Sequence, residues 1–430
     1  MPASMSLYAI IFIALLRSMC ARSSFSAPML PMSAAPLRFS TKACLSSRDI
    51  SECLQKIDNM NILLSPDSFK GTLTSSEVCD IIESALRNRI PDCNVIKLPA
   101  ADGGEGLCSS FANFIDGEWI SADAKDPFGL SLRAEYYMLE SGAAVIETAS
   151  CAGLPLAGDR ADPTVTTTAG VGMLIRDAVN RGAKRIVLGL GGSATNDCGA
   201  GMASELDFRF LDKNNNSFVP VGGTLIDVEH IIPPEKPVDI PVVVACDVTN
   251  PLFGVDGAAY VFAPQKGANA EQVGLLDRGL HHMADILKRD LNFNSENLPG
   301  AGAAGGLGAG ASAFLNAELR SGIDIVLDES GFDKLAANAD IVITGEGRFD
   351  SQSVNGKVMS GVCRRAAKAG AKVYAVCGCA SNDADPAALG IDKLFVSSDG
   401  THGMDELRLS CRRELFAAAS VLAEEIIKFD

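Results

Sequence analysis

The sequence contains only four histidines, and none of them stands in a metal-ligand pattern. Its thirteen cysteines are scattered without regular spacing. Cys377 and Cys379 form the one close pair, and no second pair or histidine cluster accompanies it, which argues against a structural zinc site. Scattered thiols are typical of a reducing compartment rather than of a disulfide framework.

Several nucleotide and catalytic motifs are also missing. The sequence has no G-x-x-x-x-G-K-[ST] phosphate loop, since Gly356-Lys357 is followed by Val358. It has neither the H-R-D nor the D-F-G motif of protein kinases, and no G-x-S-x-G elbow of serine hydrolases. A protein-kinase fold and nucleophilic hydrolysis are therefore unsupported.

The sequence contains fewer basic residues (37 Lys and Arg) than acidic residues (53 Asp and Glu). The formal net charge is −16, which argues against nucleic acid or an anionic membrane surface as the main partner. A nucleotide remains compatible, because local Lys, Arg or Mg²⁺ can offset phosphate charge. With 430 residues, 47% of them hydrophobic, the chain is expected to be a soluble globular protein with more than one core, and a homodimer is possible.

Residues 1–59 differ from the rest. The apolar run 7–16 is too short to span a bilayer comfortably, and a Ser-, Ala- and Arg-rich stretch follows it. No Asp or Glu occurs in residues 1–48. This composition predicts a removable two-part presequence, with the plastid as the favoured destination and the mitochondrion second, and no membrane segment in the mature form.

From residue 60 onwards, the recurring unit is a buried strand, a polar glycine-rich loop and a helix. Strands are predicted at 61–64, 95–98, 185–188, 242–245, 340–344 and 373–377. Such units predict an α/β fold with parallel sheets covered by helices. Ligands of these folds bind at the carboxyl ends of the strands, where each polar loop begins.

The stretch 189–201, GLGGSATNDCGAG, follows one of these strands. Glycines let backbone N–H groups approach an anion, and hydroxyl or amide side chains add donors. We predict a phosphate or nucleotide site here, formed by Gly191, Gly192, Ser193, Thr195 and Asn196.

A second glycine-rich segment, 299–310, matches G-x-G-x-x-G. A dinucleotide site would need a strand directly before this motif, and none is predicted there. Two readings stay open, a closely packed backbone segment and a phosphate cradle at the start of a helix from Ala311. The residues concerned are Gly300, Gly302, Gly305 and Gly306.

Carboxylates cluster in the loops that leave the strands. Phosphoryl transfer needs oxygen ligands for Mg²⁺, a group that orients or deprotonates a hydroxyl, and cationic donors. For any single Asp in such a loop, helix capping is the commoner role. The candidate catalytic residues are Asp67, Lys70, Asp197, Asp247 and Arg348, and the candidate metal ligands are Asp102, Glu105, Glu346 and Asp350.

Eight segments in order resemble the glycerate kinase type 1 family over about residues 60–430. They are SPDSFKG (65–71), PAADGGEG (99–106), DPTVTTTAGVG (162–172), GLGGSATND (189–197), ACDVTNPLFG (245–254), FAPQKGA (262–268), PGAGAAGGLG (299–308) and TGEGRFDSQSVNGK (344–357). The resemblance implies ATP- and Mg²⁺-dependent phosphorylation of D-glycerate, with 2-phosphoglycerate as the expected product.

The resemblance also implies two domains with the active site in the cleft between them. A discontinuous flavodoxin-like domain would comprise residues 60–120 and 298–430, and a mixed α/β, restriction-enzyme-like domain would be inserted at 121–297. Cys198 and Asp207 stand where the family usually has glycine, so a left-handed backbone at Cys198 is in doubt, and Asp207 is expected in a surface turn.

The sequence is also compatible with two alternative functions. One is a catalytically inactive sensor of glycerate or nucleotide. The other is an oxidoreductase that would use the Gly300–Gly305 match.

Overall fold

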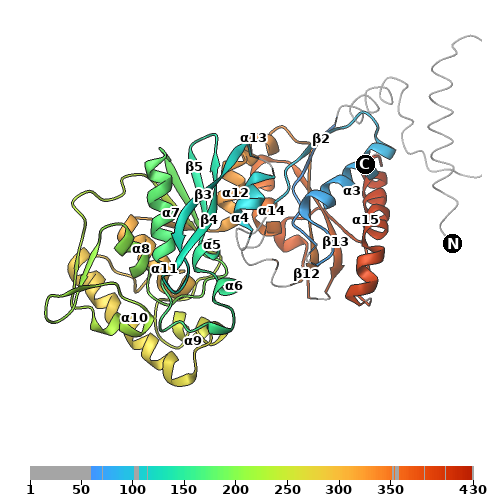
Figure 1. Cartoon of the computed structure of the whole chain (residues 1–430). Helices are drawn as coiled ribbons and strands as arrows, with labels where there is room; N and C mark the ends of the chain where they lie inside the picture. Colours follow the sequence, from blue (N-terminus) through green and yellow to red (C-terminus); the bar gives the residue numbers. More distant parts are fainter. Residues whose placement is uncertain are drawn as a thin grey trace, which may run out of the picture. The chain divides into compact units, whose positions relative to one another are not determined.

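The computed structural model describes residues 60–69, 71–100, 106–113, 115–350, 353, 358–381, 383–401 and 403–428. The predicted presequence 1–59, the predicted cation Lys70 and the predicted metal ligands Asp102 and Glu105 lie outside the described residues. The described strands form two large sheets and one small sheet, and helices cover the large ones (Figure 1). The α/β fold predicted from the sequence is thereby confirmed.

The first sheet has five parallel strands and is built from both ends of the described chain. Its order is β14-β13-β12-β1-β2. Renumbered within the sheet this is the flavodoxin-like order 2-1-3-4-5, whose direction reverses between β1 and β12. The strand bounds are Asn61–Leu64 (β1), Asn94–Lys97 (β2), Ile341–Phe349 (β12), Lys372–Ala380 (β13) and Lys393–Val396 (β14).

Alternate residues of these strands enter the cores on the two faces of the sheet. Ile62 and Leu64 pack in the core of α3 (Ser75–Arg89) and α15 (Met404–Ile426), whereas Leu63 packs in that of α12 (Gly322–Glu329), α13 (Phe332–Ala336) and α14 (Val358–Ala369). Helix α3 begins with the predicted capping box, because Glu77 N donates to Thr74 Oγ1 at 3.2 Å and Thr74 N donates to Glu77 Oε2 at 2.9 Å.

The second sheet has six strands in the order β11-β10-β6-β5-β4-β3. Strands β5, β6, β10 and β11 pair in parallel, and β3, β4 and β5 pair antiparallel. Helix α7 (Ala169–Asn180) contributes its apolar side to the core of one face, and α4 (Leu107–Ala112) to that of the other. The strand bounds are Gly117–Lys125 (β3), Ser131–Leu139 (β4), Ala143–Glu147 (β5), Arg185–Gly189 (β6), Val242–Ala245 (β10) and Glu318–Arg320 (β11).

Strands of the six-stranded sheet come from both sides of the expected insertion, 121–297. Strand β3 begins at Gly117, and β11, at 318–320, pairs with β10. Local sequence patterns do not reveal that the segment after residue 297 still contributes a strand to the six-stranded sheet. Strand β11 is only three residues long, and its pairing with β10 is a long-range contact. The predicted boundaries, and an active site between the two domains, stay predictions.

The remaining elements are short or lie around the second sheet. Strands β7 (Arg209–Leu211), β8 (Ser217–Phe218) and β9 (His230–Ile232) form the small antiparallel sheet. Within the part of the chain that the structure describes, no helix combines the length and apolarity that crossing a membrane would require. The other helices are Ala149–Ala152 (α5), Leu154–Ala157 (α6), Ala200–Glu205 (α8), Ala258–Phe262 (α9), Ala270–Leu291 (α10) and Ala303–Leu315 (α11).

Candidate active site

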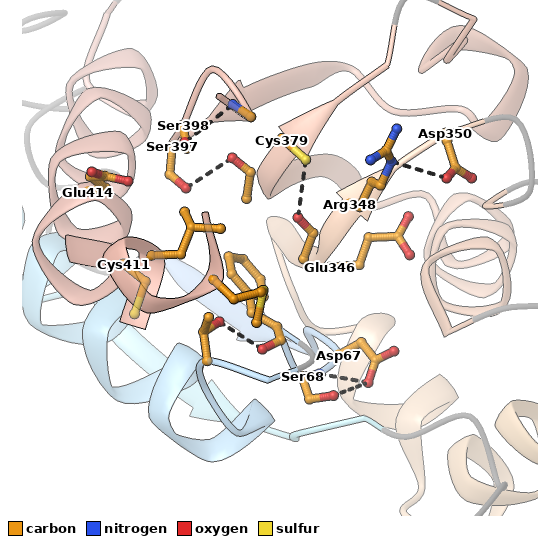
Figure 2. Close-up of a pocket in the computed structure, with 17 residues that line it drawn as sticks. Asp67, Ser68, Glu346, Arg348, Asp350, Cys379, Ser397, Ser398, Cys411 and Glu414 are labelled. Atoms are coloured by element: carbon orange, nitrogen blue, oxygen red, sulfur yellow. Dashed lines mark hydrogen bonds and ion pairs between the residues drawn. The ribbon is translucent and has the colours of Figure 1, made fainter. Parts of the chain in front are cut away.

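A cavity of about 360 Å³ lies beyond the carboxyl ends of β1 and β12, where the strand order of the five-stranded sheet reverses. We call it the carboxylate pocket (Figure 2). It brings together four predicted site residues from two segments far apart in the sequence, the loop after β1 and the end of β12 with the turn that follows it. These are Asp67, Glu346, Arg348 and Asp350.

Asp67 is positioned by the continuation of the pairing of β1 with β12. Its backbone N donates to Gly345 O at 2.8 Å, which is the next hydrogen bond of the parallel ladder after the one from Ser65 N to Ile343 O. Ser68 N then donates to Asp67 Oδ1 at 2.6 Å, which fixes the rotation of the carboxylate. The loop therefore presents Asp67 to the pocket in a defined orientation.

Glu346 and Arg348 are two residues apart on β12, so their side chains leave the same face of the strand. Glu346 is buried, while 69% of the Arg348 side chain is exposed. Arg348 Nε lies 3.6 Å from Asp350 Oδ2, an ion pair that solvent weakens (Figure 2). The guanidinium can therefore turn towards an anionic ligand at small cost.

Asp350 begins the turn that follows β12. Its backbone N donates to Ser353 Oγ at 3.1 Å, and Ser353 N donates back to Asp350 O at 3.0 Å. The sequence left open whether Asp350 only caps the next helix. Most of the residues between Asp350 and α14 lie outside the described ranges, so both roles stay predictions.

A second cavity, of about 310 Å³, lies at the carboxyl ends of β6 and β10 of the six-stranded sheet. We call it the glycine-turn pocket. Predicted residues from two loops, Gly191, Gly192, Ser193 and Asp247, line it. The Asp247 carboxylate accepts a hydrogen bond from Gly322 N, the first residue of α12, at 2.9 Å. Both cavities fall at the small end of the usual range for ligand pockets.

Lys266 also lines the glycine-turn pocket and was not among the predicted site residues. Its side chain is buried, and its Nζ donates to Ser193 Oγ at 2.9 Å and to Thr195 O at 2.8 Å. Burial lowers the pKa of the ammonium to about 7, and the negative charge of Asp197 acts in the opposite direction. The signal in the sequence is the FAPQKGA segment (262–268), in which Lys266 does not follow a predicted strand.

Asp197 lies inside the protein rather than in either cavity. Its carboxylate accepts hydrogen bonds from Thr168 N (2.7 Å), Thr168 Oγ1 (2.8 Å), Gly199 N (3.1 Å) and Gly201 N (3.2 Å). Burial raises the pKa of the carboxyl, and these donors oppose the rise. The geometry is that of a junction tying the starts of α7 and α8 together, and the catalytic role expected of Asp197 stays a prediction.

Thr195 and Asn196 are likewise fully buried and line neither cavity. Within the described ranges, Thr195 Oγ1 and both polar atoms of the Asn196 amide have no hydrogen-bond partner. Their predicted contact with a nucleotide stays a prediction.

The glycines of the second glycine-rich segment are buried against other backbone. A Cβ on Gly302 would lie 2.2 Å from Pro251 O, and one on Gly305 would lie 2.0 Å from Thr195 O. Gly300 and Gly306 would also meet neighbours, at 2.7 Å and 2.9 Å. These contacts support the packing reading, although Ala303 and Ala304 of this segment do line the glycine-turn pocket.

The expected helix from Ala311 lies within α11 (Ala303–Leu315), which is interrupted by a kink where residues 304–306 have left-handed backbone. Gly305 and Gly306 suit left-handed backbone because they lack a Cβ, and Gly305 also lies close to the turn at 195–198. Cys198 and Asp207 also have left-handed backbone, with φ of 52° and 69°. The doubt raised by Cys198 was therefore wrong, since its backbone keeps the conformation that glycine favours.

Comparison with known proteins agrees with these observations. The chain matches the glycerate kinase family over residues 62–427. It is 42% identical to the glycerate kinase of Bacillus subtilis over 344 residues, 78% of this chain and 90% of that protein. It is 42% identical to the glycerate 2-kinase of Escherichia coli, over 80% of this chain and 92% of that protein.

A solved structure is similar as well. The crystal structure of a candidate glycerate kinase 2 from Salmonella typhimurium LT2 superposes with a TM-score of 0.76 at 36% identity, covering 86% of this chain and 98% of that one.

Proposed function

Since the chain belongs to the glycerate kinase family and is a kinase, we propose that it transfers the terminal phosphoryl group of ATP to the 2-hydroxyl of D-glycerate, with Mg²⁺ as cofactor. The choice of hydroxyl follows the name of the E. coli relative, a glycerate 2-kinase. One observation carries the proposal: the carboxylate pocket joins Asp67, Glu346, Arg348 and Asp350 where the strand order reverses.

In this proposal the carboxylate pocket holds the acceptor. Arg348 would bind the carboxylate of glycerate, for which a guanidinium is well suited, and Lys70 would be the second cation. Asp67 would accept the proton of the attacking hydroxyl as the oxygen–phosphorus bond forms and the bond to ADP breaks. Its orientation by Ser68 N and Gly345 O suits that task.

The residues present fit an Mg²⁺ ion that is bound jointly by the protein and the nucleotide, rather than one bound by protein side chains alone. Among the described residues, no group of three or more His, Cys, Asp or Glu side chains could hold a metal by itself. Mg²⁺ is usually bound by one or two carboxylates together with phosphate oxygens and water. Glu346 and Asp350 provide such oxygens, and the bound ion would neutralise charge on the transferring phosphoryl group.

The glycine-turn pocket would receive the phosphates of ATP. Gly192 has a φ of +70°, and the O of the same residue is held by Leu154 N at 2.8 Å, so the turn has a fixed shape. Backbone N–H groups of such a turn suit anionic oxygens.

The test is a coupled assay of ADP release by the purified full chain with D-glycerate, ATP and MgCl₂. We expect turnover that stops when any one of the three is omitted, and ³¹P NMR should show a single 2-phosphoglycerate product. A 3-phosphoglycerate product would overturn the choice of hydroxyl. Binding of glycerate or nucleotide without turnover would overturn the kinase activity in favour of a sensor.

We further propose that residues 1–59 direct the protein to a plastid. The support is their composition, with no acidic residue before Asp49. A fusion of residues 1–59 to a fluorescent protein should enter plastids in cells that have them. Mitochondrial or diffuse fluorescence would overturn the proposal.

A further inference from the structure

Lys266 is a buried lysine that pairs with no carboxylate among the described residues. The residue is 2% exposed, and the hydrogen bonds of its Nζ to other described residues involve no carboxylate. Its two hydrogen bonds go to neutral oxygens, Ser193 Oγ and Thr195 O. An ammonium has three donors, so one of them is left for another partner.

Burying an uncompensated charge is costly, and proteins usually relieve the cost by pairing the charge or neutralising it. Within the described part of the chain, the titratable groups around Lys266 do not pair with it directly. Asp197 acts on it through space, and its carboxylate is already occupied by four N–H and O–H donors. Asp247 and Cys246 line the same cavity, and the Asp247 carboxylate holds Gly322 N.

The cavity beside Lys266 has further unused donors. Gly191 and Gly192 line it, and within the described part of the chain their backbone N–H groups donate no hydrogen bond. An ammonium next to two consecutive backbone N–H groups is a combination that favours a tetrahedral oxyanion with several oxygens.

We propose that Lys266, together with the backbone N–H groups of Gly191 and Gly192, binds the phosphate oxygens of the nucleotide in the glycine-turn pocket. This inference rests on the proposed function, because it assigns the nucleotide of that reaction to one cavity. Lys266 would keep two bonds to the turn and turn its third donor towards the phosphate. Nucleotide binding would thereby supply the anion that the buried ammonium lacks.

The first test is ADP binding by the full chain, measured by calorimetry without glycerate. Lys266→Met should raise the dissociation constant of ADP about 10- to 100-fold, the range expected for a lost charge-assisted hydrogen bond. The matched control is Lys184→Met, because Lys184 is an exposed lysine whose stem packs on Gly142 of the same domain. It should bind ADP like the wild type.

Steady-state kinetics separates phosphate binding from a purely structural role. Lys266→Met should raise the KM for ATP and leave that for D-glycerate within about twofold. Equal increases in both KM values, or unchanged ADP affinity in a folded variant, would overturn the inference.

The second test needs only the wild-type chain and serves if Lys266→Met does not fold. Between pH 7.5 and 9.5 the charge of the phosphate is constant, since its second pKa is about 6. The Lys266 pKa of about 7 means that the free protein increasingly lacks the proton as pH rises. The ADP dissociation constant should therefore rise up to about tenfold per pH unit, with a proton taken up on binding.

A flat profile without proton uptake would overturn the inference. Both binding tests require no turnover. If ADP binding depends on Lys266 but no glycerate is phosphorylated, the proposed function fails and the nucleotide site stands.

Discussion

The carboxylate pocket and the glycine-turn pocket lie at equivalent places, the carboxyl ends of parallel strands, yet they are built in opposite ways. The first presents charged side chains that are partly exposed, such as Arg348 and Asp350. The second combines backbone donors with one lysine that is almost completely buried. In the proposed reaction, the partly exposed charged side chains would bind the small acceptor, and the backbone donors with the buried lysine would bind the phosphates.

The largest effect is expected from the carboxylate pocket. Asp67→Asn preserves the shape of the side chain and removes its ability to take a proton, so kcat should fall about 10²- to 10⁴-fold with an unchanged melting temperature. Asp92→Asn, at an exposed Asp just before β2 of the same sheet, is the matched control and should keep wild-type kcat. Turnover of Asp67→Asn within a few-fold of wild type would remove this residue from the chemistry.

The next effect concerns a residue that lines neither pocket. In Asp197→Asn the new amide would place an NH₂ group against N–H donors, so the free energy of unfolding should fall by about 2–3 kcal/mol. Urea unfolding measures the loss, and kcat of the folded variant should stay within about fivefold of wild type. Wild-type stability with a large loss of kcat would instead support the catalytic role expected from the sequence.

A smaller effect is expected for substrate binding. Arg348→Met should raise the KM for D-glycerate about 10- to 100-fold, because a charge-assisted contact with the carboxylate is lost, and Arg348→Lys should be intermediate. Arg364→Met is the matched control, since Arg364 is also exposed and paired with an aspartate, Asp324. If the KM for ATP rises instead, the assignment of ligands to the two pockets is reversed.

The smallest effect is expected on stability, at Asp207, a residue outside the pockets whose backbone is left-handed. Asp207 has a φ of 69° and pairs with Arg176 at an exposed position, where an ion pair adds little. Asp207→Gly should be more stable than Asp207→Ala by about 1 kcal/mol, because only alanine retains a Cβ in this conformation. Equal stability in thermal unfolding would show that the backbone is not left-handed at residue 207 in solution.

Local sequence patterns were sufficient for part of the carboxylate pocket. Asp67, Glu346 and Asp350 follow or end hydrophobic strands, and parallel pairing places such strand ends along one edge. The direction of a buried carboxylate is not a local property. Asp197 follows a strand in the same way, but it turns inward because Thr168, Gly199 and Gly201 offer it four donors.

The sequence by itself determined the α/β class, the recurring unit of strand, glycine-rich loop and helix, and the family, because periodicity and motifs are properties of consecutive residues. Only the tertiary structure decided which loops share a cavity. Asp67 and Glu346 meet because β1 pairs with β12, a contact across most of the chain. Lys266 reaches the glycine turn only after packing buries it, and burial gives the same ammonium a pKa of about 7.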